Sequence, residues 1–147
     1  MLLIVLFLLG VAYVVWFTDL FKKEGIQIIT QMRPMRSTRP QRNTGAEPVY
    51  PVSFTFNGKY LFTSVKVVGA DDLATNKYPV ALLHYISDSN SVPTKFWLYG
   101  HEIKGMRPAI ARAKPEQLQP DVKYVLLLET DRLKARTNFH TSSPPAP

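Results

Sequence analysis

At 147 residues with a net charge of +7, the chain has room for one folded domain and an accessory segment, which excludes an enzyme built from tandem domains. No cysteine is present, so disulfide scaffolds, thiolate zinc sites and cysteine nucleophiles are excluded as well. Twelve prolines against seven glycines, together with eight Phe and seven Tyr, favour a protein of strands and turns over a helical one.

Residues 1–21 predict a membrane-spanning helix. The first 17 positions carry no charged side chain, and Trp16 and Phe21 stand where interfacial aromatic residues belong. At 1.5 Å per residue, 21 helical residues span about 31 Å, close to the roughly 30 Å of a hydrocarbon core. A cleaved signal peptide is the alternative. However, no basic residue precedes the apolar run, and the best cleavage motif, at residues 10–12, would cut through its middle. We therefore expect an uncleaved, single-pass anchor in the membrane.

Two features give opposite signals for the side of the membrane on which the body lies. Basic residues follow the predicted span, and the positive-inside bias then places the following domain in the cytoplasm. A leading apolar anchor before a proline-rich strand domain is also a common layout of exported bacterial proteins, which places the domain in the cell envelope. Both orientations stay open at this level.

Residues 22–48 join the anchor to the body and are strongly basic. A first strand is predicted over residues 26–31, and a Pro- and Arg-rich loop with little to bury follows it. We expect this segment to be a solvated loop or to contact anionic lipid head groups. Nucleic acid is not favoured, because no aromatic residues are interleaved with the basic ones. The basic residues are Lys22, Lys23, Arg33, Arg36, Arg39 and Arg42.

The clearest local pattern centres on Asn57-Gly58 and predicts a β-hairpin. Apolar and polar residues alternate before this pair, and Asn-Gly favours the positive φ angles of a two-residue type I′ turn. With that turn, Phe54 faces Leu61, and the apolar faces of the two strands coincide. Phe62 then lies on the opposite face.

Further strands are predicted over residues 80–87, 94–99, 122–128 and 132–139. Residues 69–79 read as a connection, and residues 100–120 have no clear period. The last strand alternates charged and apolar residues, which is typical of an edge strand that must not recruit another sheet. We expect the body to cover residues 49–140 and residues 141–147 to form a disordered tail.

The segment from Leu118 to Tyr124, LQPDVKY, resembles the tyrosine corner of fibronectin type III and other immunoglobulin-like sandwiches. In that motif a Leu-x-Pro turn leads into a strand, and the Tyr hydroxyl bonds to upstream backbone. The alternative is an ordinary proline turn before a strand. Separately, residues 87–108 are similar to a stretch of small uncharacterised membrane-anchored bacterial proteins, which implies no chemistry.

The expected fold class is therefore all-β: an antiparallel immunoglobulin-like sandwich of about seven strands, preceded by one transmembrane helix. The paired cysteine and tryptophan marks of true immunoglobulin domains are absent, so the resemblance implies a sandwich without implying a ligand.

Few residues suggest catalysis. His84 shares a strand face with apolar residues, which favours a core or boundary position over a ligand role. His101 lacks the second histidine that a zincin motif places at helical spacing. A hydrolase that uses His84 or His101 with Asp88 is the remaining catalytic hypothesis, although no G-x-S-x-G motif supports it. Neither a metal site nor a cofactor is expected.

Two groups of residues suggest binding. Trp97 and Tyr99 share one strand face and predict a platform for a sugar or a peptide, with burial in the core as the alternative. Arg132, Lys134 and Arg136 form a cationic stripe along the last strand, which could attract an acidic polymer or simply protect the edge.

The sequence as a whole predicts a membrane-anchored, non-catalytic binding or scaffolding protein of unknown ligand. Its first partner would be the lipid bilayer, through residues 1–21. The alternatives are a membrane-tethered adaptor that binds anionic lipid or nucleic acid through the basic linker, and a small hydrolase.

Overall fold

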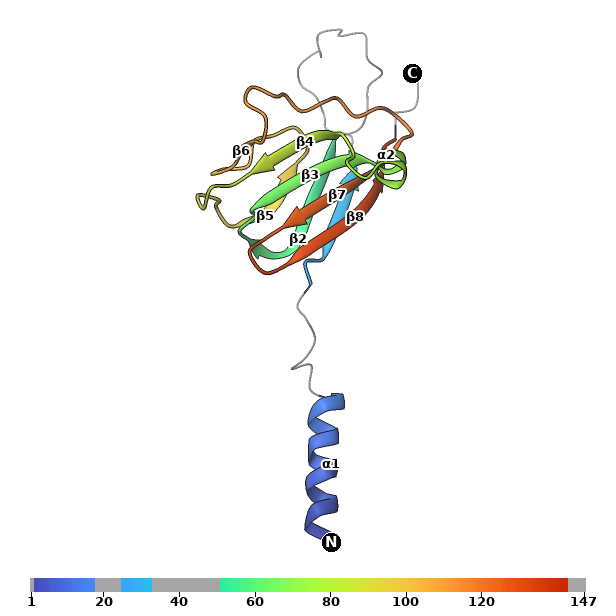
Figure 1. Ribbon diagram of the computed structural model, residues 1–147, viewed down its shortest axis with the longest axis vertical. Coiled ribbons are helices and arrows are strands. Elements are labelled where there is room, and N and C mark those ends of the chain that lie inside the picture. The colour runs from blue at the N-terminus through green and yellow to red at the C-terminus, as the bar shows by residue number, and fades with distance from the viewer. Residues whose placement is uncertain (1, 18–24, 33–50, 143–147) are drawn as a thin grey trace.

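The computed structural model describes residues 2–17, 25–32 and 51–142. Helix α1 (Leu2–Phe17) stands apart from two stacked antiparallel sheets (Figure 1). Among the described residues, no helix combines the length and the apolar character needed to cross a membrane, and α1 has 16 residues. Residues 18–21, which complete the predicted span, lie outside the described residues.

A three-stranded and a five-stranded sheet make up the body, so the predicted all-β class is confirmed. The three-stranded sheet has the order β1-β2-β5, with β1 (Ile28–Met32), β2 (Val52–Tyr60) and β5 (Thr94–Leu98). The five-stranded sheet has the order β6-β4-β3-β7-β8, with β3 (Ser64–Gly69), β4 (Ala81–Ile86), β6 (Arg107–Pro108), β7 (Lys123–Glu129) and β8 (Lys134–His140). Apart from the two-residue β6, the described strands number seven, as predicted.

The core lies between the two sheets and is rich in aromatic residues. Phe54 of β2 is fully buried, stacks on Trp97 of β5 at 5.4 Å and meets the edge of Phe139 of β8 at 5.2 Å. These contacts join both sheets, so truncating Phe54 to Ala should destabilise the fold by about 3–5 kcal/mol. Alternation along β2 places every second side chain in this core, because successive residues of a strand point to opposite faces.

The predicted hairpin at Asn57-Gly58 is wrong, because both residues lie inside the continuous strand β2. Neither residue has a positive φ. The Asn57 side chain bonds instead to the start of the sheet: its Oδ1 accepts the Gln27 N–H at 3.1 Å, and its Nδ2 donates to the Gly25 carbonyl. The pair falls where the register of β2 against β5 shifts, so Asn-Gly here accompanies a strand irregularity and not a turn.

The chain crosses between the sheets just after β2, which changes the position of Phe62. This ring was expected on the face opposite Phe54, but it is 1% exposed and meets Phe56 edge-on, with centroids 5.0 Å apart. The next strand, β3, therefore pairs with β4 and β7 and makes no ladder with β2.

The connection predicted over residues 69–79 contains a short helix, α2 (Ala70–Thr75). It packs against β3 and β7 (Figure 1), on the face of the five-stranded sheet that points away from the core. Val68 and Val125 are buried there outside the main core cluster. The helix thus covers one end of the outer face of the five-stranded sheet.

The end of β8 is tied more tightly than predicted. Thr141, assigned to the tail by its sequence, is fully buried. Its Oγ1 accepts the Val122 N–H at 3.1 Å and donates to the Gln119 carbonyl, which fastens the strand end to the turn before β7. The body therefore extends past the predicted boundary at residue 140, while residues 143–147 lie outside the described residues.

Candidate functional site

Cationic side chains gather on the outer face of the five-stranded sheet, which we call the cationic face. The register pairs Lys66 of β3 with Leu127 of β7, and Leu127 with Arg136 of β8. Side chains paired directly across an antiparallel ladder lie about 5 Å apart at Cβ, so residues of different strands form one row. The cations of this face are Lys66, Arg107, Lys123, Lys134 and Arg136.

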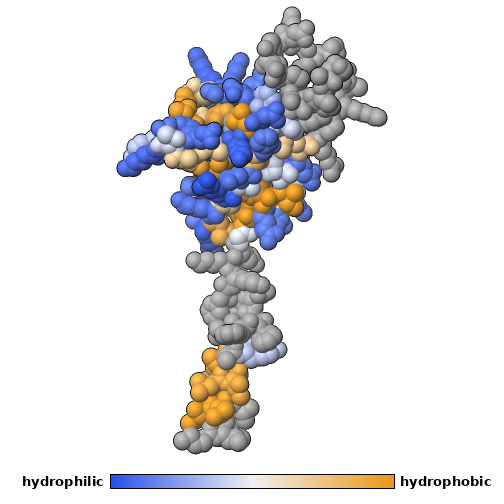
Figure 2. All heavy atoms as spheres, turned by 90° about the vertical axis from the view of Figure 1, so that its right-hand side faces the viewer, coloured by the Kyte–Doolittle hydropathy of each residue, from blue (hydrophilic) through white to orange (hydrophobic). Residues whose placement is uncertain are grey.

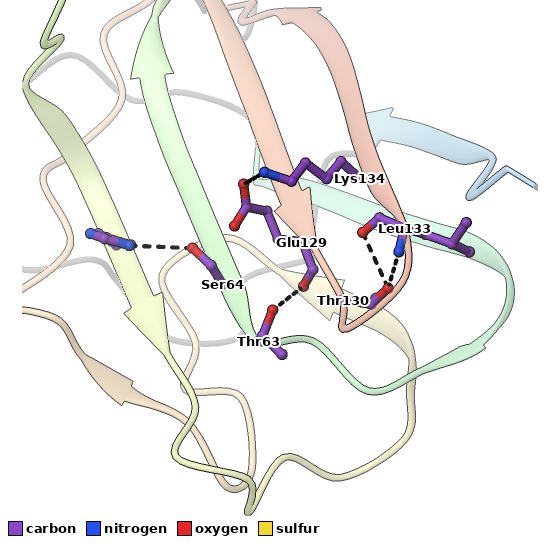
Figure 3. A network of polar contacts seen from close by, with 7 residues as sticks. Thr63, Ser64, Glu129, Thr130, Leu133 and Lys134 are labelled. Carbon is purple, nitrogen blue, oxygen red and sulfur yellow. Dashed lines mark hydrogen bonds and ion pairs between the residues drawn. The ribbon is translucent and has the colours of Figure 1, made fainter.

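Two carboxylates beside these cations, Glu129 and Asp88, are already paired, and α2 adds Asp71 and Asp72 at one end of the face. Glu129 contacts Lys134 at 3.1 Å, next to Ser64 in the close view (Figure 3), and Asp88 contacts Arg107 at 2.8 Å. All four of these side chains are substantially exposed, so each pair adds little to stability.

The remaining cations of the face are Lys66, Lys123 and Arg136. In the part of the chain that the structure describes, no carboxylate forms an ion pair with any of them. Their positive potential is therefore available to an external anion.

His84 lies in the same row as Lys66, on β4. Its Nε2 lies 3.3 Å from the Ser64 hydroxyl. Partial burial and the neighbouring Lys66 ammonium lower the pKa of His84, while Glu129 opposes this shift. At neutral pH the imidazole is therefore uncharged, and it can exchange a hydrogen bond but adds no positive charge to the face.

The predicted stripe of Arg132, Lys134 and Arg136 is brought onto this face only in part. The edge position of β8 and the outward direction of Lys134 and Arg136 are confirmed. Arg132 instead lies in the turn between β7 and β8, which Thr130 closes by accepting the Leu133 N–H at 2.9 Å (Figure 3).

Sequence reasoning missed Lys66, Arg107 and Lys123 as members of the cationic face. They come from three strands, and only the pairing of β3, β6 and β7 within one sheet brings them to the same side. Alternation in the segment 64–69 was the available signal, because it separates Lys66 from the buried Val65 and Val67.

Trp97 and Tyr99 do not form an open binding platform in the structure. Trp97 is 3% exposed, stacks on Phe54 and donates its indole N–H to the His101 carbonyl at 2.8 Å. The Tyr99 hydroxyl donates to the Glu116 carbonyl at 2.8 Å, and burial raises the pKa of Tyr99 above its usual range. Both residues thus serve the core and the loop before β7, which was the alternative interpretation.

The two candidate histidines are not joined to Asp88. His84 contacts Ser64, whereas Asp88 pairs with Arg107. His101 is exposed, and its backbone carbonyl receives the Trp97 indole. The contacts among the described residues therefore contain no histidine–aspartate relay, and no group of three or more His, Asp or Glu within these residues is placed to hold a metal ion.

The basic linker residues lie outside the described residues, so their predicted contact with anionic head groups stays a prediction. The residues concerned are Lys22, Lys23, Arg33, Arg36, Arg39 and Arg42.

The local geometry expected for the segment from Leu118 to Tyr124 is present. The Tyr124 hydroxyl accepts the backbone N–H of Gln119 at 2.9 Å, and Leu118 is buried in the core cluster. Comparison with known proteins adds nothing further: no family model, no curated protein and no solved structure matches the chain.

Proposed function

We propose that this chain is a membrane-anchored, non-catalytic binding protein that presents its cationic face to an acidic ligand. The observation that carries the proposal is the gathering of five cations from four strands on one sheet face, where Glu129 and Asp88 are already ion-paired. A flat face of separated ammonium and guanidinium groups suits an extended acidic polymer better than a small molecule, because small ligands need a concave site.

The anchor rests on α1. Its sequence, LLIVLFLLGVAYVVWF, has no charged residue and no polar face, and the side chains described along it are exposed. Figure 2 shows these residues as a largely orange surface, in contrast to the mixed surface of the sheets. A helix that is apolar all round belongs in a protein core or a bilayer. The span predicted from the sequence, residues 1–21, has the length of a hydrocarbon core.

The sandwich itself is proposed to be immunoglobulin-like. If the two-residue β6 is left out, seven strands remain. β1, β2 and β5 form one sheet, and β3, β4, β7 and β8 form the other. Immunoglobulin-like sandwiches divide their strands between the sheets in a similar way. The bond from Gln119 to Tyr124, at the start of the penultimate strand, also supports this class.

The test is binding of fluorescent polyglutamate to the full chain in nanodiscs of zwitterionic lipid. We expect binding that weakens with added salt, because the contacts are exposed charges. The triple variant Lys66→Gln, Lys123→Gln, Arg136→Gln removes the three cations of the face that form no ion pair with a carboxylate of the described residues. At roughly 0.3–0.7 kcal/mol for each exposed contact, affinity should fall by about 5- to 30-fold.

A matched control removes the same charge elsewhere. The variant Lys59→Gln, Lys95→Gln, Lys104→Gln changes three exposed lysines that do not belong to the cationic face. It should retain nearly all of the affinity. Equal losses in the two triple variants would show attraction to net charge alone, and polyglutamate binding that ignores salt would likewise contradict the proposal.

A further inference from the structure

The outer face of the three-stranded sheet differs sharply from the cationic face. Its register places Ile29 beside Thr55, and Thr55 beside Phe96, in one row across all three strands. Ile29 is 56% exposed and Phe96 is 57% exposed. We define the uncharged face by six of its side chains: Ile29, Gln31, Ser53, Thr55, Phe96 and Leu98.

An uncharged face of this kind is unusual for a sheet that meets water. Antiparallel sheets usually carry polar and charged residues on their solvated face. Single exposed apolar residues are ordinary, but Ile29 and Phe96 are both more than half exposed on the same small face, with Leu98 on the same strand as Phe96 and no charged residue among the six. We therefore expect another surface to cover the uncharged face.

We propose that the uncharged face rests on the bilayer in which α1 is anchored, an inference that depends on the proposed anchor. Helix α1 ends at Phe17 and β1 begins at Ile28. Eleven residues reach at most about 40 Å when fully extended, so the body cannot move far from the membrane. Strand β1 is the first strand after the anchor, and it contributes Ile29 to the uncharged face.

The composition of the face suits the head-group region. Phe96, Ile29 and Leu98 would enter the boundary between head groups and acyl chains, as the apolar residues of interfacial segments do. The Thr55 hydroxyl lies between Ile29 and Phe96, where it can exchange hydrogen bonds with lipid head groups, whereas the Ser53 hydroxyl already donates to the Gln31 carbonyl at 3.2 Å.

This orientation also constrains the acidic ligand. The two sheets are stacked (Figure 1), so their outer faces point in opposite directions. With the uncharged face on the bilayer, the cationic face would be turned away from it. The ligand would then approach from the aqueous side and would not be the anionic lipid of the same membrane.

The absence of cysteine makes a site-specific test straightforward. Single-cysteine variants of the full chain, each carrying the fluorophore NBD, would be reconstituted in phosphatidylcholine vesicles with and without doxyl-labelled lipid. Thr55→Cys probes the uncharged face and leaves Ile29 and Phe96 in place. Asn138→Cys is the matched control on the opposite face, where Asn138 is exposed on β8. Leu8→Cys reports on the anchor.

We expect doxyl lipid to quench most of the emission at positions 55 and 8, and little of it at position 138. Adding Ile29→Ser and Phe96→Ser to the Thr55→Cys variant should reduce its quenching to that of the control. Quenching at position 8 with equal, weak quenching at 55 and 138 would overturn this inference and leave the anchor intact. If doxyl lipid does not quench the label at position 8, the proposed membrane anchor itself is overturned. A third outcome is a label at position 55 whose emission is blue-shifted but not quenched by doxyl lipid. If that emission shifts to the red when the protein-to-lipid ratio is lowered, the face is covered by a second copy of the chain. This result would overturn contact with lipid.

Discussion

Two glycines with similar positive φ angles but different surroundings give a sharp test of how the loops pack. Gly100 has a φ of +83° and Gly105 a φ of +79°. Alanine at either position must adopt a left-handed conformation, which costs roughly 1–2 kcal/mol. That shared term makes Gly100→Ala a matched control for Gly105→Ala.

The surroundings separate the two positions. A Cβ atom at Gly105 would lie 1.7 Å from the carbonyl oxygen of Asn90, whereas a Cβ at Gly100 would have no heavy atom within 4 Å. The neighbour is backbone, so the two loops would have to move apart. That movement would strain the hydrogen bond from the Val92 N–H to the Lys104 carbonyl, now 3.2 Å long. Overpacking and a weakened bond together predict that Gly105→Ala loses about 2–4 kcal/mol more stability than Gly100→Ala.

The assay is urea unfolding of the full chain in detergent, followed by far-ultraviolet circular dichroism, which reports on the sheets. Gly100→Ala should shift the midpoint slightly and Gly105→Ala strongly, with similar slopes for both. A Gly105→Ala protein too unstable to measure beside a folded Gly100→Ala protein would agree with the reasoning. Equal midpoints for the two variants would refute it, because the loops would then not approach each other at Gly105.

Two further predictions concern a buried hydroxyl and a histidine. Tyr124→Phe leaves the Gln119 N–H without its acceptor, so the free energy of unfolding should fall by about 1–3 kcal/mol; an unchanged urea midpoint would show that this bond contributes nothing. Burial and the Lys66 ammonium lower the pKa of His84, and Glu129 opposes this shift. The unfolded chain therefore binds a proton at His84 more readily than the folded chain does. Stability should therefore decline as the pH drops below about 6.5, and His84→Gln should decline less over the same range in thermal melts. Parallel pH profiles for the two proteins would contradict this account.

The cationic face shows how far local reasoning reaches into a site. Lys134 and Arg136 alternate with apolar residues along one strand, so their shared outward direction follows from the sequence, and their edge position was predicted correctly. Lys66 and Lys123 belong to other strands, and they join the face only because β3 and β7 pair in the same sheet. The order of the strands in the sheet brings these cations onto one face, and no single segment of the sequence encodes that order.

The amino-acid sequence by itself determined most of the extended segments and, in strands such as β2 and β8, which face is buried, because a strand repeats every two residues and burial follows that period. It also determined the apolar character of α1 and the turn that presents Tyr124. Only the tertiary structure decided that the chain passes through Asn57-Gly58 without turning and carries Phe62 into the core beside Phe56. The physical reason is that the preference of Asn-Gly for a tight turn is small compared with the aromatic burial gained when β2 pairs with β1 and β5 and β3 joins the opposite sheet.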